Sequence, residues 1–309
     1  MSSLNTNIAA MTALQTLNQT NKEMLVTQNR VSTGLRVKDA SDNAAYWSIA
    51  TTMRSDNMSV STVQDALGLG AATADVAVTA MNNAIEAVSK IKAKLVAARA
   101  PGLDREKIQS EISALQTELR STAESAVFSG ENWLNVDSTG PITKTIVASF
   151  SRDSTGAITI GSIEVDVGPT GTMLFDTSGN NQGVLDYERT TSGTSITYSV
   201  ATLDISAITD DPLELADLEE MIQGVDDALA LMTDAATVLG AAKSRISMQK
   251  DFVSKLIQSI DTGIGQLVDA DMNEESTRLQ ALQVRQQLGV QALGIANQSA
   301  QQILRLFQS

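Results

Sequence analysis

The stretch AMTALQTLNQTNKEMLVTQNRVSTGL, residues 10–35, decides the fold of this chain. Its apolar residues recur at alternating steps of four and three, a heptad pattern that is typical of a helix packed against another helix. The positions are Ala10, Leu14, Leu17, Asn21, Met24, Gln28, Val31 and Leu35. We therefore predict a long amphipathic helix near the N-terminus, with one face turned toward a partner helix.

The C-terminal end repeats this alternation over about four heptads. The positions are Leu279, Leu282, Gln286, Gly289, Leu293, Ala296, Ala300, Ile303 and Phe307. Polar Asn21, Gln28 and Gln286 interrupt the two seams, and in coiled coils such residues lower stability while they restrict register and partner choice. Periodicity alone fits either a helical hairpin within one domain or helices that assemble with other copies.

The placement of charge favours assembly. Residues 1–21 contain no ionisable side chain, and after Arg278 the only charged residues are Arg285 and Arg305. A helix that faces solvent normally carries charge on its outer face, whereas the outer positions here are Asn, Gln and Thr. Amide and hydroxyl groups can form hydrogen bonds inside a packed assembly without the cost of desolvating charge.

The rest of the chain divides into helices and one insert. Residues 43–99 predict a helix that Pro101 and Gly102 end, and Asp104 is a good N-cap for a second helix that stops near residues 128–130. Residues 137–207 are rich in Gly, Thr and Ser, and alternating runs such as 157–163 and 194–200 predict short strands and turns. Pro212 closes the insert, and helix returns from about Asp217 to Leu267.

These elements predict a mainly α fold. Its core is a long antiparallel helical hairpin or coiled coil built from both termini, with a small β-rich central insert. We expect three parts: residues 1–44 with 267–309, residues 45–137 with 207–266, and residues 138–206.

Composition excludes much chemistry. The chain has no Cys and no His, which removes disulfides, thiolate metal sites and His-dependent triads. Its net charge of −14 opposes nucleic acid and anionic membrane as partners. Asp269, Asp271 and Asn273 have the opening spacing of a calcium loop, but Glu274 stands where Gly is required and Gln280 where Glu is required. We expect no enzymatic activity, no catalytic or metal site and no cofactor.

The stretch RVSTGLRVKDASDNAAYWSIA, residues 30–50, closely resembles the N-terminal signature of bacterial flagellins. In that signature an Arg, two small hydroxyl residues and Gly precede Leu-Arg, and an Asp-rich Ala-Ala segment follows. Further similar segments are residues 5–7, Phe128-Ser129-Gly130, residues 239–246 and the ending from Gln286 to Arg305. Tyr46 and Trp47 resemble the form found in rhizobial and other alphaproteobacterial flagellins.

The resemblance covers residues 1–137 and 207–309 and implies a structural subunit of the flagellar filament, which serves swimming motility. It implies a D0 domain from the terminal helices, a D1 helical domain and a small outer domain. Expected partners are many copies of the chain, alone or with other flagellins, a flagellar export chaperone, and cap and hook-associated proteins. Because no basic stretch and apolar core of a signal peptide is present, the expected route outside is the flagellar type III system, without cleavage.

The expected polymerisation interface consists of Leu4, Ile8, Met11, Leu14, Leu17, Met24, Val31, Leu35, Leu282, Leu293, Ile303, Leu306 and Phe307. By resemblance, Arg30, Ser32, Gly34, Tyr46 and Trp47 belong to the segment that plant receptors read. Residues 85–96 align with the segment that the animal flagellin receptor reads, with Val88, Ser89, Ile91 and Leu95. Ser89 stands where enteric flagellins place an arginine, and Ser cannot supply a bidentate contact, so weak activation of that receptor is predicted.

Three alternatives remain open. A hook–filament junction protein shares the terminal design and differs in forming a ring of few copies. A carboxylate-based hydrolase would need a convergent motif in the insert. An intracellular coiled-coil scaffold would leave the charge-poor termini unexplained.

Overall fold

The computed structural model describes residues 7–153, 155–169 and 171–307, with side chains described as far as residue 298. It contains two compact units: Met1–Asn57 with Gln258–Ser309, called unit 1, and Met58–Ile257, called unit 2. The helices are α1 (Ile8–Thr33), α2 (Ala44–Ala98), α3 (Arg105–Ser125), α4 (Pro212–Val268) and α5 (Met272–Phe307). The unit boundaries fall within α2 and α4.

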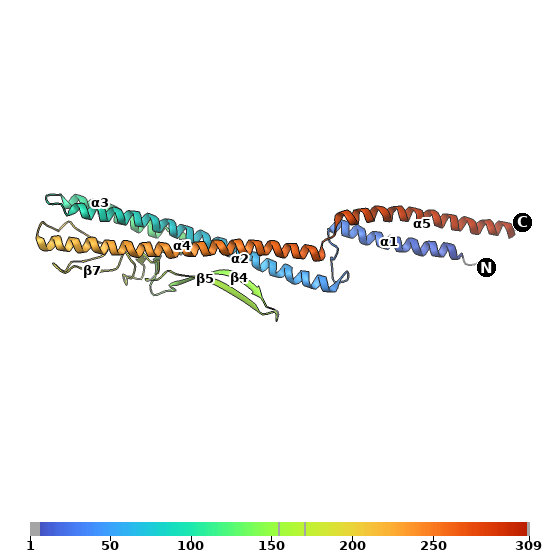
Figure 1. Ribbon diagram of the computed structural model, residues 1–309, viewed down its shortest axis with the longest axis horizontal. Coiled ribbons are helices and arrows are strands. Elements are labelled where there is room, and N and C mark those ends of the chain that lie inside the picture. Colours follow the sequence, from blue (N-terminus) through green and yellow to red (C-terminus); the bar gives the residue numbers. More distant parts are fainter. Residues whose placement is uncertain (1–6, 154, 170, 308–309) are drawn as a thin grey trace. The chain divides into compact units, whose positions relative to one another are not determined.

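Unit 1 is built around α1 and α5, which lie side by side (Figure 1). α1 begins after Asn7, whose Oδ1 accepts a hydrogen bond from the Ala10 amide at 3.0 Å, and it ends at Gly34. The φ of Gly34 is 72°, in the left-handed region that favours glycine, and its N–H donates to the Arg30 carbonyl at 2.8 Å. Both ends of α1 are therefore specified by local sequence.

Asp271 begins α5 in the same way. Its Oδ1 accepts hydrogen bonds from the amides of Asn273 at 2.9 Å and Glu274 at 3.3 Å. These bonds satisfy donors that the first turn of a helix leaves free. The Asp271–Asn273 spacing that opens like a calcium loop is thus explained by helix capping.

The two linkers of unit 1 pair with each other. Leu35 and Asp269 form an antiparallel bridge, the Ala270 amide donates to the Gly34 carbonyl at 2.9 Å, and the Arg36 amide donates to the Val268 carbonyl at 2.7 Å. A small hydrophobic cluster lies beside this bridge. It contains Val37, Ala50, Ile264 and Val268.

Unit 2 contains the larger hydrophobic core, to which α2, α3 and α4 each contribute one face. Leu67, Met81, Ile91 and Leu95 of α2 are fully buried, as are Ile112 of α3 and residues 221, 225, 232, 239 and 246 of α4. The predicted N-cap of α3 is confirmed, because Asp104 accepts a hydrogen bond from the Lys107 amide.

The insert contributes short strands to unit 2. They are β1 (Val127–Phe128), β2 (Glu131–Asn132), β3 (Asn135–Val136), β4 (Thr143–Arg152), β5 (Ile158–Asp166), β6 (Phe175–Asp176), β7 (Arg189–Thr190) and β8 (Thr197–Tyr198). β1–β2, β4–β5 and β7–β8 are antiparallel pairs, whereas β3–β6 is parallel. The long hairpin β4–β5 (Figure 1) buries Ile146, Ile163 and Val165 in the core shared with the helices.

The predicted fold class is confirmed: the chain is mainly α, with a small β-rich insert between helices. Two details differ. α4 begins at Pro212 rather than near Asp217, because proline at the first helical position has a suitable φ and lacks only an N–H that would be unpaired there. The alternating run 194–200 forms only the two-residue strand β8. The expected division into three parts stays a prediction.

Candidate assembly interface

The inner face of α5 follows the predicted heptad seam. Leu282 is buried, and Leu279, Gln286, Gly289, Leu293 and Ala296 are half-buried between exposed neighbours. On α1 most of the predicted seam faces inward: Ala10, Leu17, Asn21, Met24 and Val31 are half-buried, as is Leu35 just after the helix. The alternate inward positions are Ala13, Thr20 and Thr27, whereas Leu14 and Gln28, each one residue further on, are exposed.

Small residues at these positions let α1 and α5 approach closely. A Cβ at Gly289 would lie 3.3 Å from Leu17 Cδ1. Thr20 and Thr27, the only buried residues among those described in α1, add little bulk. The close approach explains why the seam uses Ala13 and Thr20 rather than the bulkier Leu14.

Hydrogen bonds set the register of this helix pair. Gln286 Nε2 donates to Asn21 Oδ1 at 2.8 Å, and Asn7 Nδ2 donates to the Ala296 carbonyl at 2.9 Å. Two of the three polar interruptions in the seams, Asn21 and Gln286, are therefore partners of each other, whereas Gln28 is exposed. A pair of this kind disfavours shifted alignments, because sliding either helix would leave an amide unpaired.

An ion pair fixes the end of α1 near the linkers. Arg30 Nη1 lies 2.9 Å from Glu275 Oε1, and the Glu275 side chain is 6% exposed. Arg278 is a more distant second cation, 3.9 Å from the same oxygen. Glu275 Oε2 is buried without a hydrogen-bond partner among the described residues, so Arg30 is the group that compensates this buried carboxylate.

The outward faces of the two helices are unusually apolar. On α1, Ile8 is 67% exposed and Met11 63%; on α5, Leu288 is 59% exposed and Ile295 68%. Leu14, Leu25, Val26, Val284 and Val290 are also exposed. Contiguous exposed apolar surface on a soluble protein marks an interaction site, so these faces are candidates for contact with other chains.

The residues predicted for the polymerisation interface fall into two groups in the structure. Ile8, Met11 and Leu14 are exposed, whereas Leu17, Met24, Val31, Leu35, Leu282 and Leu293 lie between the helices or in the linker. Leu4 lies outside the described residues, and so do the side chains of Ile303, Leu306 and Phe307.

Sequence reasoning missed Val284, Leu288 and Ile295, which form one outward stripe of α5. Their spacings of four and seven residues repeat along a helix face. The sequence contains the spacing of this outward stripe, but the longer heptad seam that begins at Leu279 runs along the same stretch of the helix and leads to the prediction of a single apolar face. A helix with two apolar faces has more contacts to make than one partner helix can supply.

The signature segment spans the end of α1, the linker and the start of α2. Arg30 is half-buried in its ion pair, Ser32 is exposed and Gly34 is the helix cap. Tyr46 is 43% exposed and Trp47 36%.

The linker in this segment forms a tight turn. The hydroxyl of Ser41 donates to Asp39 Oδ1, and this hydrogen bond lowers the pKa of Asp39. The carboxylate therefore stays charged at neutral pH.

The second receptor-related segment lies in α2 within unit 2. Val88, Ile91 and Leu95 are fully buried, and only Ser89 of the four predicted residues is exposed. The Ser89 hydroxyl donates to the Ile85 carbonyl at 2.8 Å. A molecule that binds this face of the folded chain would meet Ser89 rather than its three apolar neighbours.

Across residues 7–153, 155–169 and 171–307, no group of three or more Asp or Glu could hold a metal ion. In the same described ranges, no helix combines the length and the apolar character needed to cross a bilayer.

Comparison with family models matches both ends of the chain. Residues 4–139 match the bacterial flagellin N-terminal helical region, and residues 222–307 match the bacterial flagellin C-terminal helical region. The two matches leave most of the insert and the start of α4 between them.

Curated relatives match over their whole length. Flagellin C of Rhizobium meliloti strain 1021 is 48% identical, with 100% of both chains covered. Flagellin of Brucella melitensis is 46% identical, with 99% of both covered. Flagellin A of Rhizobium meliloti strain 1021 is 44% identical over 395 aligned positions, covering 99% of this chain and 100% of that protein. Because 395 exceeds the 309 residues here, that relative contains residues that have no counterpart in this chain.

Proposed function

This chain belongs to the bacterial flagellin family, and from this premise we propose how its helices build the polymer. Like its relatives it is a structural subunit of the flagellar filament, which lies outside the cell. The hook-associated alternative has no better support, because the curated relatives that cover the whole chain are flagellins.

We propose that the outward apolar faces of α1 and α5 form the polymerisation interface. The supporting observation is the exposure of Ile8, Met11, Leu288 and Ile295 on the charge-poor terminal parts of these helices, where residues 1–21 carry no charged side chain and residues 279–309 carry two arginines. Burying one such side chain contributes about 1.5–3 kcal/mol, whereas association costs about 4–15 kcal/mol. One contact is too weak, so assembly depends on many contacts repeated along an open helical lattice.

The residues predicted from sequence have different parts in this proposal. Ile8, Met11 and Leu14 contact neighbouring copies directly, together with Val284, Leu288 and Ile295. Leu17, Met24, Val31, Leu282 and Leu293 act indirectly, because they hold α1 against α5. Leu4, Ile303, Leu306 and Phe307 belong to the same proposed interface on sequence grounds alone.

The domain division is also a proposal. We assign residues 1–44 with 267–309 to the terminal assembly domain, residues 45–137 with 207–266 to the helical shaft, and residues 138–206 to a small outer domain. The unmatched stretch between the two family regions supports a variable outer part.

The remaining partners follow from family membership. We propose export through the flagellar type III system, a dedicated chaperone before export, and contact with cap and hook-associated proteins at the filament ends. We also propose that the chain has no enzymatic role, since its family is structural.

The receptor-related segments carry two further proposals. Tyr46 and Trp47 distinguish the segment 30–50 from the form that plant receptors read strongly, and a peptide of residues 30–51 is expected to elicit weakly. Ser89 makes the chain a poor ligand for the animal flagellin receptor. Strong responses in the matching reporter assays would contradict each proposal.

Reassembly of purified protein tests the filament function. Monomer dissociated in acid and returned to neutral pH, with sheared filament fragments as seeds, is expected to form long filaments visible by electron microscopy. Closed rings or a stable monomer under these conditions would contradict the proposal.

Substitutions on α5 test the proposed interface. Leu288→Glu and Ile295→Glu place a carboxylate on the outward stripe, and because burying an unpaired charge is costly, each variant is expected to stop filament growth. Gln283→Glu is the matched control: it adds the same charge on the same helix, one residue before Val284 and thus about 100° away. Equal loss of growth in all three variants would show that charge, rather than the stripe, matters.

A further inference from the structure

A second exposed apolar face lies on α4 within unit 2. Leu231 is 49% exposed, Val238 44%, Met248 63% and Phe252 58%. Together with exposed Ala241 and Arg245 they follow a heptad spacing, one position away from the buried residues 232, 239, 242, 246 and 253 and the half-buried Gln249. We call these six residues, 231, 238, 241, 245, 248 and 252, the α4 ridge.

The ridge has no partner in its own copy. Its members stay exposed although the neighbouring face of α4, one position further along, is packed into the core. Arg245, at its centre, forms no ion pair with any residue in the described part of the chain. An apolar strip around an unpaired cation is suited to a neighbouring surface that offers small side chains and a carboxylate.

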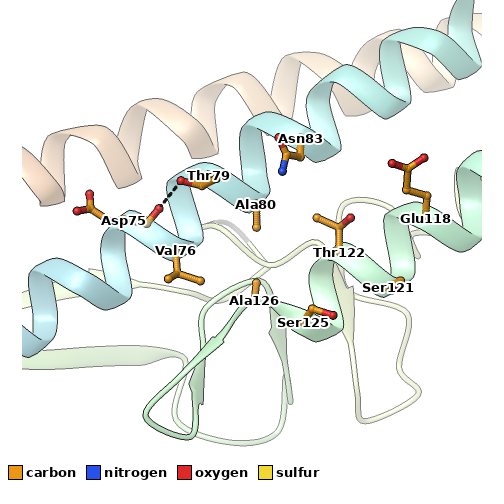
Figure 2. Close-up of a pocket in the computed structure, with 10 residues that line it drawn as sticks. All are labelled: Asp75, Val76, Thr79, Ala80, Asn83, Glu118, Ser121, Thr122, Ser125 and Ala126. Atoms are coloured by element: carbon orange, nitrogen blue, oxygen red, sulfur yellow. Dashed lines mark hydrogen bonds between the residues drawn. The ribbon is translucent and has the colours of Figure 1, made fainter.

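The groove between α2 and α3 offers such a surface. Figure 2 shows Val76 and Ala80 of α2 facing Thr122 of α3 and Ala126, the residue that caps α3, with Ser125 beside them. The groove has a volume of about 540 Å³, and its floor is made by the buried Ala80 and Ala126.

The two ends of the groove differ in their charge. Asn83 and Glu118 line one end, and Asp75 lines the other (Figure 2). Asp75 Oδ1 is 2.6 Å from Lys243 Nζ, so its charge is already compensated. Glu118 forms no ion pair among the described residues: Lys90 lies near enough to feel its charge, but the ammonium of Lys90 is paired with Glu86.

Ridge and groove lie on different sides of the same helical bundle. Lys243 points to the Asp75 end of the groove, and Arg245, two residues further on, is about 160° away around α4. A copy therefore cannot insert its ridge into its own groove. A ridge on one side and a groove on the other make a head-to-tail contact, which generates open polymers when it does not close into a ring.

The lengths of the two surfaces also match. Arg245 to Phe252 spans about 10 Å of helix, and Glu118 to Ala126 spans about 12 Å. With Arg245 beside Glu118, Met248 would lie over Thr122 and Phe252 over Ala126. The apolar side chains then cover the floor, and Arg245 gains a carboxylate partner in Glu118.

We propose that the α4 ridge of one copy occupies the α2–α3 groove of a neighbouring copy in the filament, with Arg245 paired to Glu118. The inference rests on the filament function. It adds to the α1 and α5 faces a lateral contact made entirely by unit 2.

Charge reversal tests the pairing. Arg245→Glu and Glu118→Arg each place like charges together, and either variant is expected to raise the critical concentration for seeded assembly about tenfold or more, since 1.4 kcal/mol corresponds to a factor of ten. The double variant restores the pair and is expected to assemble within about threefold of the original chain. Lys107→Glu, an exposed reversal on α3 outside the groove, serves as the control.

Mixing adds a test that misfolding cannot imitate. In an equimolar mixture, the Glu of one variant's ridge meets the Arg of the other variant's groove, and the reverse contact pairs Arg with Glu. At a concentration too low for Arg245→Glu or Glu118→Arg to assemble alone, the mixture of the two is therefore expected to co-assemble into alternating filaments. Circular dichroism of each monomer verifies that both remain folded.

A disulfide locates the contact directly, because the chain contains no native Cys. Filaments of the variant Ser125→Cys/Phe252→Cys are expected to form ladders of cross-linked copies on mild oxidation, whereas the dispersed monomer is not.

The outcomes separate the two proposals. If the original chain fails to assemble, the filament function and this contact are both wrong. If the chain assembles and Arg245→Glu does so at the same concentration, or if neither the double variant nor the mixture recovers, only the ridge–groove contact is overturned. Absence of cross-linked ladders in intact filaments would overturn it as well.

Discussion

The two units of this flagellin solve the problem of burial in opposite ways. Unit 2 buries large side chains such as Leu67, Met81 and Ile91 completely. In unit 1 the hydrophobic cluster has four residues beside the linkers, and the buried residues described in α1 are Thr20 and Thr27. Unit 2 has a large core of its own, whereas unit 1 leaves many large apolar residues exposed, among them Met11, Leu288 and Ile295.

This contrast explains how one chain can combine a folded core with surfaces that serve assembly. A helix pair stabilised by few buried side chains is marginal alone, because isolated helices gain most of their stability from tertiary packing. The outward residues Met11, Leu288 and Ile295 supply that packing only in an assembly. We expect the terminal helices of the monomer to fray and to become ordered on assembly.

Hydrogen exchange should give the largest difference between the units. In the monomer, amides of α1 and α5 are expected to exchange at least about 100-fold faster than amides of the buried stretch of α2 around Ile91, because local opening requires less free energy where few contacts are lost. In filaments the difference should largely disappear. Equal protection of both units in the monomer would contradict the contrast.

Arg105→Met should produce the next largest effect, this time in unit 2. The buried guanidinium donates from Nε to the Ala98 carbonyl at 3.0 Å and from Nη1 to the Ile208 carbonyl at 3.3 Å, and its Nη2 lies 2.6 Å from Asp210 Oδ1. Its loss leaves two carbonyls unpaired, so we expect the free energy of unfolding to fall by about 3 kcal/mol.

The matched control for this variant is Arg99→Met. Arg99 also pairs with a carboxylate, that of Glu219, but its side chain is 60% exposed, so a loss of at most about 1 kcal/mol is expected. Denaturant unfolding of the monomer measures both. Similar losses would show that burial does not distinguish the two arginines.

Gly70→Ala should have a smaller effect that depends on packing. A Cβ at Gly70 would lie 2.7 Å from Ile146 Cδ1 in the core of unit 2, and overpacking costs about 1–3 kcal/mol. Gly68 in the same helix and Gly294 in α5 have no atom within 4 Å of the added carbon. Alanine at either is expected to stabilise its helix by up to about 1 kcal/mol. Destabilisation by Gly294→Ala in the monomer would mean that unit 1 is more tightly packed than we infer.

Much of the fold could be predicted from sequence because local signals agree with the global structure. Asp104 caps α3 as expected, and the seam from Leu279 to Ala296 is the inner face of α5. On α1, however, a heptad seam that starts at Ala10 can continue through Ala13 or through Leu14, because both lie three or four residues further on. Periodicity alone therefore could not decide which of the two faces α5. The greater hydrophobicity of Leu14 favoured it in the prediction, whereas the close approach of two helix backbones favours the smaller Ala13.

The candidate interface was predictable only in part for the same reason. Ile8 and Met11 were expected at the interface and are exposed, but Leu288 and Ile295 were missed because their stripe overlaps the seam. The ridge on α4 could not be separated from core residues one position away, such as Leu239 and Ile246, until their burial was known.

The most direct test of the account is deletion of residues 286–309. Such a chain retains all of unit 2, including the α4 ridge and the α2–α3 groove, but loses Leu288, Ile295 and the bond between Gln286 and Asn21. Seeded assembly followed by electron microscopy is expected to show dispersed, folded monomer and no filaments. Long filaments from the shortened chain would contradict the claim that its terminal helices hold the polymer together.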